Sequence, residues 1–113
     1  MEKNNKNDNR NKEVAPFITV LYELVNDRSA QDDICWSTDS THPGFVVLNP
    51  IRLSKEFLPK YLRHSNYAAF VKQMEVYGFQ QVEHPLGLCY MHPDFKKGHK
   101  ELLYKIHKNL INN

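Results

Sequence analysis

The sequence predicts one domain of the α+β class, in which helices pack against a small antiparallel sheet. Residues 66–77 carry apolar side chains at the spacing of an α-helix and contain neither Gly nor Pro. Four short runs of β-forming residues occur in two pairs, and turn-forming residues separate the members of each pair. The chain has 113 residues, of which 41% are hydrophobic. That is enough for one modest core and too little for two domains.

The N-terminal part is expected to be a disordered arm, residues 1–13, followed by a folded domain at 14–111. The arm is rich in Asn and mixes four basic with three acidic residues, a composition that cannot bury a core. The first helix of the domain is predicted from Pro16 to about Asn26, because proline is tolerated in a first helical turn. Its apolar stripe has helical spacing and consists of Phe17, Leu21, Leu24 and Val25.

The first pair of β-prone runs, residues 34–36 and 45–48, is predicted to form a hairpin, because a turn-rich segment ending in Pro43 and Gly44 separates them. A second helix is then predicted to start at Asn49, where an N-cap residue precedes a proline.

This second helix is expected to run from Pro50 towards Pro59. A proline at that position removes a backbone hydrogen bond and crowds the preceding turn, so the helix ends or kinks there.

The third predicted helix, residues 66–77, has two different faces. It begins after Ser65 and Asn66, which favour helix N-termini, and ends before Gly78. The apolar face should point inward and consists of Tyr67, Phe70, Val71 and Met74. The opposite face carries small, amide and cationic side chains, namely Ser65, Ala69, Lys72, Gln73 and Val76. A core helix of a small domain is the alternative interpretation of the stripe alone.

A second hairpin and a last helix complete the prediction. Residues 79–83 and 88–92 flank a short turn at 84–87 and should add a hairpin to the same sheet. Residues 98–111 are predicted to be helical, with cations outward at Lys97, Lys100, Lys105 and Lys108 and apolar residues inward at Leu102, Leu103, Ile106 and Leu110.

Charge is distributed unevenly along the domain. Residues 14–49 contain one basic and five acidic residues, whereas residues 50–113 contain ten basic and five acidic residues. The two parts differ by nine charges although the whole chain is only +2. The predicted third helix lies in the basic part, which favours an anionic partner for it.

Several classes of function receive no support from the sequence. The six histidines lack the spacing of a structural metal site, and no nucleophile with a base or Gly-rich phosphate loop is recognisable. We therefore expect no enzyme activity, cofactor, metal or small-molecule substrate. Cys35 and Cys89 lie in apolar β-like runs and are expected to be core thiols in a reducing compartment. No apolar stretch is long enough to cross a membrane.

Four sequence blocks with their spacing point to a known family. They are Ile34-Cys35-Trp36-Ser37, Phe57-Leu58-Pro59-Lys60-Tyr61, then Asn66, Ala68, Phe70-Val71, Gln73, Tyr77-Gly78-Phe79 and Val82, and finally His92-Pro93-Asp94-Phe95 with Gly98. This pattern resembles the DNA-binding domain of heat shock transcription factors, and the resemblance extends from about Ala15 to Leu110. The resemblance implies a winged helix-turn-helix, with a three-helix bundle on a four-stranded antiparallel sheet and 66–77 as the recognition helix.

The resemblance also implies which side chains contact DNA. Lys72 stands where the family has a guanine-reading arginine, and Gln73 matches a family glutamine. Ala69 and Val76 are suited to close approach or to a thymine methyl group. The expected phosphate contacts are Lys60, Arg63, His64, Ser65, Asn66 and Tyr77, with Lys105 and Lys108 from the last helix. Solvated surface side chains are the alternative interpretation for each of them.

If the resemblance holds, the protein is a nuclear, stress-response type transcription regulator that binds GAA-like repeats in duplex DNA and can self-associate there. Three features depart from the family. Glu75 adds a negative charge to the recognition helix, Gln80 and Gln81 replace a basic pair, and the turn at 84–87 replaces a long wing. They favour the alternative, a winged-helix interaction module that has lost DNA binding.

Overall fold

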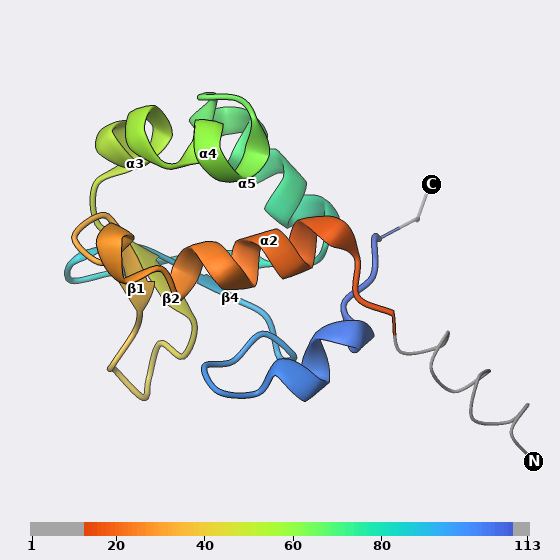
Figure 1. The fold of residues 1–113 in the computed structure, drawn as a ribbon. Coiled ribbons are helices and arrows are strands. Elements are labelled where there is room, and N and C mark those ends of the chain that lie inside the picture. Colours follow the sequence, from red (N-terminus) through yellow and green to blue (C-terminus); the bar gives the residue numbers. More distant parts are fainter. Residues whose placement is uncertain (1–12, 110–113) are drawn as a thin grey trace, which may run out of the picture.

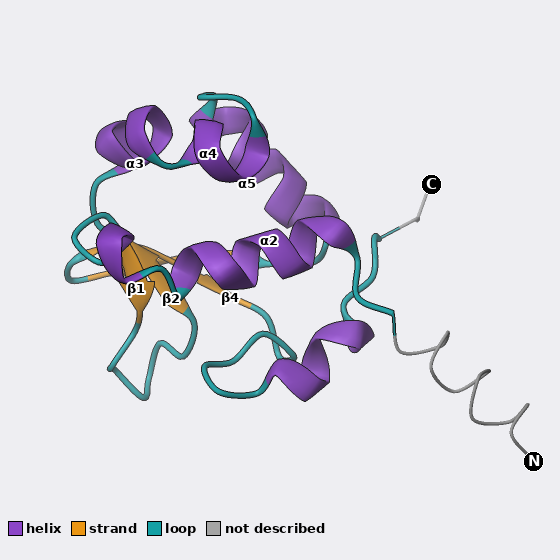
Figure 2. Cartoon of the chain, viewed as in Figure 1, coloured by secondary structure: helices purple, strands orange, loops and turns teal. Residues whose placement is uncertain are grey.

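The computed structural model describes residues 13–109, and it has helices packed on a four-stranded antiparallel sheet, as predicted (Figure 1). Helix α2 runs along the sheet, and three further helices, α3 to α5, lie together above it (Figure 2). The elements are α2 Pro16–Val25, η1 Arg28–Ala30, β1 Ile34–Trp36, β2 Phe45–Val47, α3 Pro50–Glu56, α4 Leu58–Leu62, α5 Tyr67–Val76, β3 Gln80–His84, β4 Gly87–Met91 and η2 Lys100–Lys105. Residues 1–12 of the expected arm lie outside the described part of the chain.

Both predicted hairpins belong to one sheet, whose strand order is β1-β2-β4-β3. The register is antiparallel throughout and aligns Cys35, Val46, Cys89 and Val82 in one row across the strands. The sheet therefore brings the hairpin β3–β4 against the central strand β2, although more than 30 residues separate them in sequence.

Helix α2 confirms the first helical prediction. Pro16 occupies its first turn, and all four residues of the predicted stripe are buried. Ile18 is also fully buried, which the stripe did not include.

The second predicted helix is divided into α3 and α4 by a break at Phe57, whose φ and ψ are −118° and −36°. The helical path then continues through Pro59, because this proline lies in the first turn of α4, where a missing N–H costs little. The predicted kink is confirmed, and it lies two residues before the proline.

The predicted C-terminal helix is wrong over most of its length. Only Lys100–Lys105 are helical, as a 3₁₀ turn, and Ile106 is extended. The backbone N–H of Asn109 donates to the carbonyl of Val76 at 2.7 Å, a bond to α5 that a continuous helix could not make. Leu103 and Ile106 are nevertheless buried, as predicted, whereas Leu102 is half-buried and Leu110 lies outside the described residues.

Aromatic rings fill the space between helices and sheet. Phe45 on the central strand β2 contacts Phe79, Tyr90 and Phe95, with ring centroids 5.6 to 6.2 Å apart. Such contacts add to the free energy of burying the rings, and this cluster joins the sheet to the segment that follows β4.

Candidate nucleic-acid interface

Helix α5 is closed at both ends by residues that the sequence supplies locally. The Asn66 side-chain oxygen accepts the N–H of Ala69 at 3.0 Å. At the other end Gly78 has a φ of 91°, and the N–H groups of Gly78 and Phe79 donate to Glu75 and Met74 at 2.9 and 3.1 Å. This is a Schellman motif, in which glycine adopts the left-handed conformation without strain. The predicted helix 66–77 is thereby confirmed, with its end residues as caps.

Packing fixes the orientation of α5 on the domain. Phe70 and Met74 are fully buried, and Tyr67 and Val71 pack partly buried against the core, which confirms the inward stripe. The Tyr67 and Tyr90 hydroxyls lie 2.8 Å apart and join the start of α5 to strand β4. Burial and this hydrogen bond raise the pKa of Tyr67 far above that of a free tyrosine.

The exposed face of α5 is centred on Lys72. At about 100° per residue, the exposed positions fall within an arc of about 120° with Lys72 in its middle. The exposed residues are Ala68, Ala69, Lys72, Glu75 and Val76. Three of them were predicted to face outward. Ala68 and Glu75 were not among the predicted DNA contacts, although helical periodicity places both on this face.

Gln73, by contrast, lies at the margin of the exposed face. It is half-buried and lines a hollow between α5, the start of α2 and the end of α4. Arg63 and His64, two of the expected phosphate contacts, line the same hollow.

Arg63, His64, Ser65 and Asn66 lie together before the first turn of α5. Arg63 is exposed and has a left-handed backbone, with φ 66° and ψ 25°, and its N–H donates to Leu58 at 3.1 Å. The His64 Nδ1 accepts the N–H of Asn66 at 3.0 Å. A neutral His64 therefore carries its proton on Nε2, which remains available as a donor.

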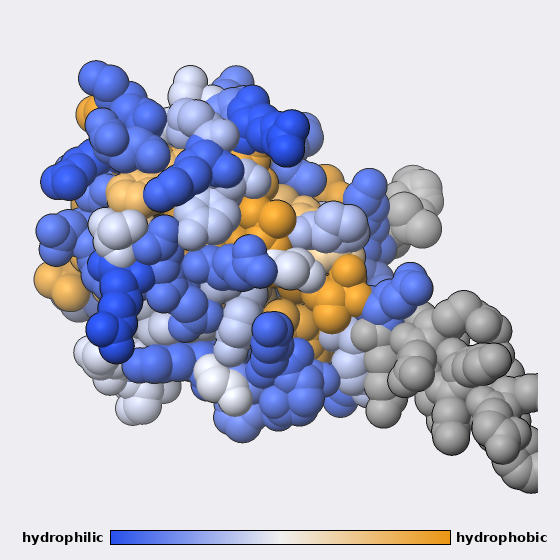
Figure 3. All heavy atoms as spheres, viewed as in Figure 1, coloured by the Kyte–Doolittle hydropathy of each residue, from blue (hydrophilic) through white to orange (hydrophobic). Residues whose placement is uncertain are grey.

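The other end of α5 is met by the C-terminal segment. The bond between Asn109 and Val76 brings Lys108 next to the last turn of α5, and both Lys108 and Lys105 are exposed. Cations from two distant parts of the sequence thus flank the helix. The view in Figure 3 shows mainly hydrophilic side chains over α3 and α4.

Two of the predicted phosphate contacts have other partners. Tyr77 is only 5% exposed and its ring stacks on Phe17 at 5.5 Å, so the ring belongs to the core and leaves little surface for the predicted phosphate contact. Lys60 lies on α4 with its Nζ 5.8 Å from the Phe57 ring, and its charge contributes to the lowered pKa of Asp27, after the hydrogen bonds of Asp27 to Ser29 and Tyr61. Lys60 is nevertheless exposed, and its phosphate contact stays a prediction.

Among residues 13–109, no three His, Cys, Asp or Glu side chains are grouped so that they could hold a metal ion. In the same residues, no helix has the length and apolar character needed to cross a membrane.

A family model described as HSF-type DNA-binding matches residues 17–109. The chain belongs to this family. Heat stress transcription factor A-4c of Arabidopsis thaliana is 32% identical over 103 residues, and B-2a of the same plant is 38% identical over 96 residues. These matches cover 91% and 85% of this chain but only 29% and 31% of the two relatives, so the chain spans less than a third of their length.

Solved structures agree with the family. The crystal structure of Chaetomium thermophilum Skn7 with SSRE DNA is 34% identical, with a TM-score of 0.77, and covers 84% of this chain and 100% of that chain. Skn7 of the same organism with HSE DNA is 32% identical, with a TM-score of 0.74 over 83% of this chain and 100% of that chain. The winged helix-turn-helix prediction is therefore confirmed.

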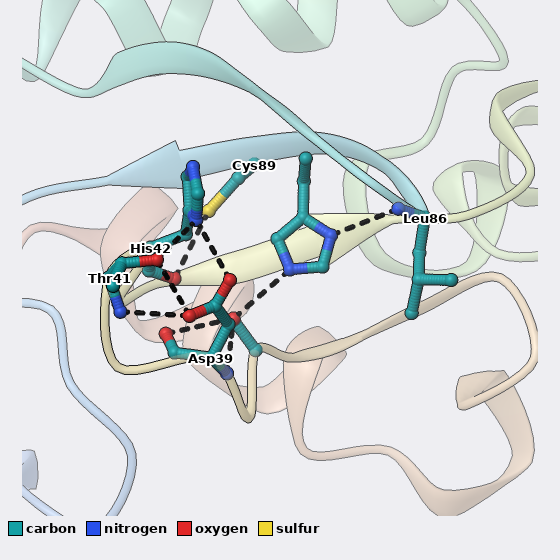
Figure 4. A network of polar contacts seen from close by, with 7 residues as sticks. Asp39, Thr41, His42, Leu86 and Cys89 are labelled. Carbon is teal, nitrogen blue, oxygen red and sulfur yellow. Dashed lines mark hydrogen bonds and ion pairs between the residues drawn. The ribbon is translucent and has the colours of Figure 1, made fainter.

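The short hairpin turn of this HSF-type domain is held by the β1–β2 loop, residues 37–44 (Figure 4). His84 accepts the N–H of Leu86 through Nδ1 at 3.1 Å, and its Nε2 lies 3.4 Å from the Ser37 hydroxyl. The rings of His84 and His42 are in edge contact at 5.4 Å. The turn that stands in the place of a wing is thus fixed to the β1–β2 loop.

Within this loop, Asp39 accepts from the Thr41 N–H and hydroxyl at 2.9 and 2.7 Å and lies 3.0 Å from His42 Nδ1. The hydrogen bonds from Thr41 and then His42 lower the pKa of Asp39 to about 2. The buried Cys89 thiol donates to the carbonyl of His42 at 3.6 Å, and burial raises its pKa. Cys89 is therefore a free core thiol, as predicted, and Cys35 is free and half-buried.

Proposed function

We propose that this domain binds duplex DNA sequence-specifically, with α5 in the major groove. The observation that carries the proposal is the exposed face of α5, where Lys72 lies at the centre between the small side chains of Ala68, Ala69 and Val76, with Glu75 at one margin. Small residues permit close approach to base edges, and Lys72 can donate to O6 or N7 of guanine. Because Lys72 has one ammonium rather than a planar fork, its preference for guanine is weaker than that of an arginine.

The dimensions of α5 suit this role. Its ten residues span about 15 Å, and the major groove is about 12 Å wide. Arg63 to Asn66 at one end and Lys108 at the other therefore lie far enough apart to reach phosphates on the two sides of the groove. Asn66 retains its side-chain NH₂ for such a contact, because only its oxygen caps the helix.

The relatives support the same function. Skn7 was crystallised with SSRE and with HSE DNA, and a further similar structure, 39% identical with a TM-score of 0.57, is a heat shock transcription factor/DNA complex. We accordingly propose that the target consists of GAA-like repeats in alternating orientation. We further propose that the protein regulates transcription in the nucleus and that copies of it associate with one another on DNA. The relatives are transcription factors by name, and we propose no enzyme activity, cofactor or small-molecule substrate.

The proposal is tested by fluorescence anisotropy on two duplexes of equal composition. One carries three alternating GAA units and the other carries the same bases permuted. We expect tighter binding to the first duplex and, for both, a linear fall of log affinity with log salt between about 50 and 200 mM. Absence of salt-dependent binding to either duplex would favour the alternative, a winged-helix interaction module that has lost DNA binding. Glu75 and the short hairpin turn are the features that support this alternative.

A further inference from the structure

We propose that Glu75 selects cytosine, by accepting a hydrogen bond from the N4 amino group beside the guanine that Lys72 binds. The inference rests on the proposed function, since it concerns the same groove-facing helix. The family resemblance assigns no role to Glu75, which is a departure from the family pattern.

The position of Glu75 on α5 supports this role. Its side chain is exposed, one turn beyond Lys72 and about 60° around the helix from it. Along the helix axis the two residues are about 4.5 Å apart, while stacked base pairs are about 3.4 Å apart. Lys72 and Glu75 can therefore reach the same base pair or two adjacent pairs.

In the described part of the chain, neither Lys72 nor Glu75 has an ion-pair partner. Both charged groups are therefore available to the groove, and neither must break an internal salt bridge before it contacts a base.

The chemistry of a carboxylate restricts which base it can accept. In the major groove, guanine presents two acceptors and thymine presents one acceptor and a methyl group, so a carboxylate finds no donor on either base. Adenine has a donor at N6 but an acceptor at the adjacent N7, which a carboxylate cannot satisfy. Cytosine offers the N4 donor without an adjacent acceptor, and it is the base that fits Glu75 best.

A carboxylate in the groove also penalises the wrong base. Closing the interface removes water from Glu75, and with no amino group opposite it the buried charge remains unpaired and close to phosphates. Discrimination of this kind arises from a cost against competing sequences, even where the overall affinity falls.

The test compares binding specificity of the wild type with two variants, Glu75→Gln and Glu75→Ala, on a duplex library varied at every position. Glu75→Gln replaces one carboxylate oxygen by an NH₂ donor, and the resulting amide can bond both N7 and N6 of adenine. The base preference at one position should therefore move from cytosine towards adenine. Glu75→Ala should lose the preference for cytosine at that position, by a factor on the order of ten. Glu23→Gln, an exposed charge deletion on α2, is the control and should leave the base preferences unchanged.

If both Glu75 variants bind every duplex more tightly by the same factor, Glu75 is only a repulsive charge and the inference is wrong. If the wild type itself shows no sequence preference, the proposed function fails first, and the inference fails with it. The affinity of the wild type for the GAA duplex, compared with its affinity for the permuted duplex, distinguishes these two results.

Discussion

Arg63 offers a direct test of how the turn before α5 serves DNA binding. Its backbone lies in the left-handed region, at φ 66°, and it is the only residue other than glycine with a positive φ among residues 13–109. Residues with a Cβ pay about 1–2 kcal/mol for this conformation. The side chain is exposed and forms no ion pair within the described residues, so stability alone does not explain an arginine there.

Two substitutions separate the backbone from the side chain. Arg63→Gly removes the left-handed strain but makes the unfolded chain more flexible, which costs about 0.5–1 kcal/mol. The net effect should be a gain of about 0.5–1 kcal/mol in the free energy of unfolding, or a rise in Tm of about 2–6 °C. Arg63→Ala keeps the Cβ and the strain, so its stability should stay within about 0.5 kcal/mol of the wild type.

Both substitutions remove the same positive charge. If Arg63 contacts one phosphate, each variant should lower the slope of log affinity against log salt by about 0.9, for every duplex alike. Arg28→Ala, which removes an exposed arginine at η1, is the control and should leave the slope unchanged.

The measurements are thermal unfolding by circular dichroism and a salt titration of DNA binding. Equal melting temperatures for Arg63→Gly and Arg63→Ala would refute the argument from backbone strain. An unchanged salt slope in both variants would refute the phosphate contact.

Three further predictions follow from other contacts. Lys72→Ala should lose about 1–3 kcal/mol of preference for one guanine, and Lys72→Arg should strengthen that preference at an unchanged salt slope, as measured on duplexes varied at each position. Equal base preferences in both variants would exclude Lys72 as a base contact. Tyr67→Phe leaves the Tyr90 hydroxyl without its partner and should lower the free energy of unfolding by about 1–3 kcal/mol in a denaturant titration. The double variant, Tyr67→Phe with Tyr90→Phe, should recover part of this loss because no unpaired hydroxyl remains. Because the pKa of Asp39 is lowered from 3.8 to about 2, its carboxylate contributes stability that is present above pH 3.8 and lost as pH falls through 2. Melting temperatures of Asp39→Asn should therefore fall less than those of the wild type between these pH values, and parallel curves would contradict this.

The elements that the sequence predicted correctly are those with local signals. Helix α5 could be bounded because Asn66 and Gly78 act on the turns next to them, and the hairpins because strand and turn residues are adjacent in the chain. The helix predicted at residues 98–111 could not be bounded by local signals. Its apolar spacing is compatible with helix, but the bond from Asn109 to Val76 depends on a residue 33 positions away.

The candidate site shows the same division. Periodicity alone placed Lys72 on the outward face of α5, and the burial pattern of the structure puts it at the centre of that face. Periodicity could not show that α2 and α4 partly cover Gln73, or that the Tyr77 ring is held against Phe17. Those outcomes depend on how neighbouring helices pack, which no window of the sequence contains.

The closed ends of α5 have a consequence for the kinetics of DNA binding. The Asn66 cap, the Gly78 turn and the Tyr67–Tyr90 bond hold the helix before any partner arrives. Association then requires no folding step, so its rate should be set by diffusion and electrostatic attraction and be similar for most duplexes. Correct and incorrect sequences should differ chiefly in how long the complex lasts.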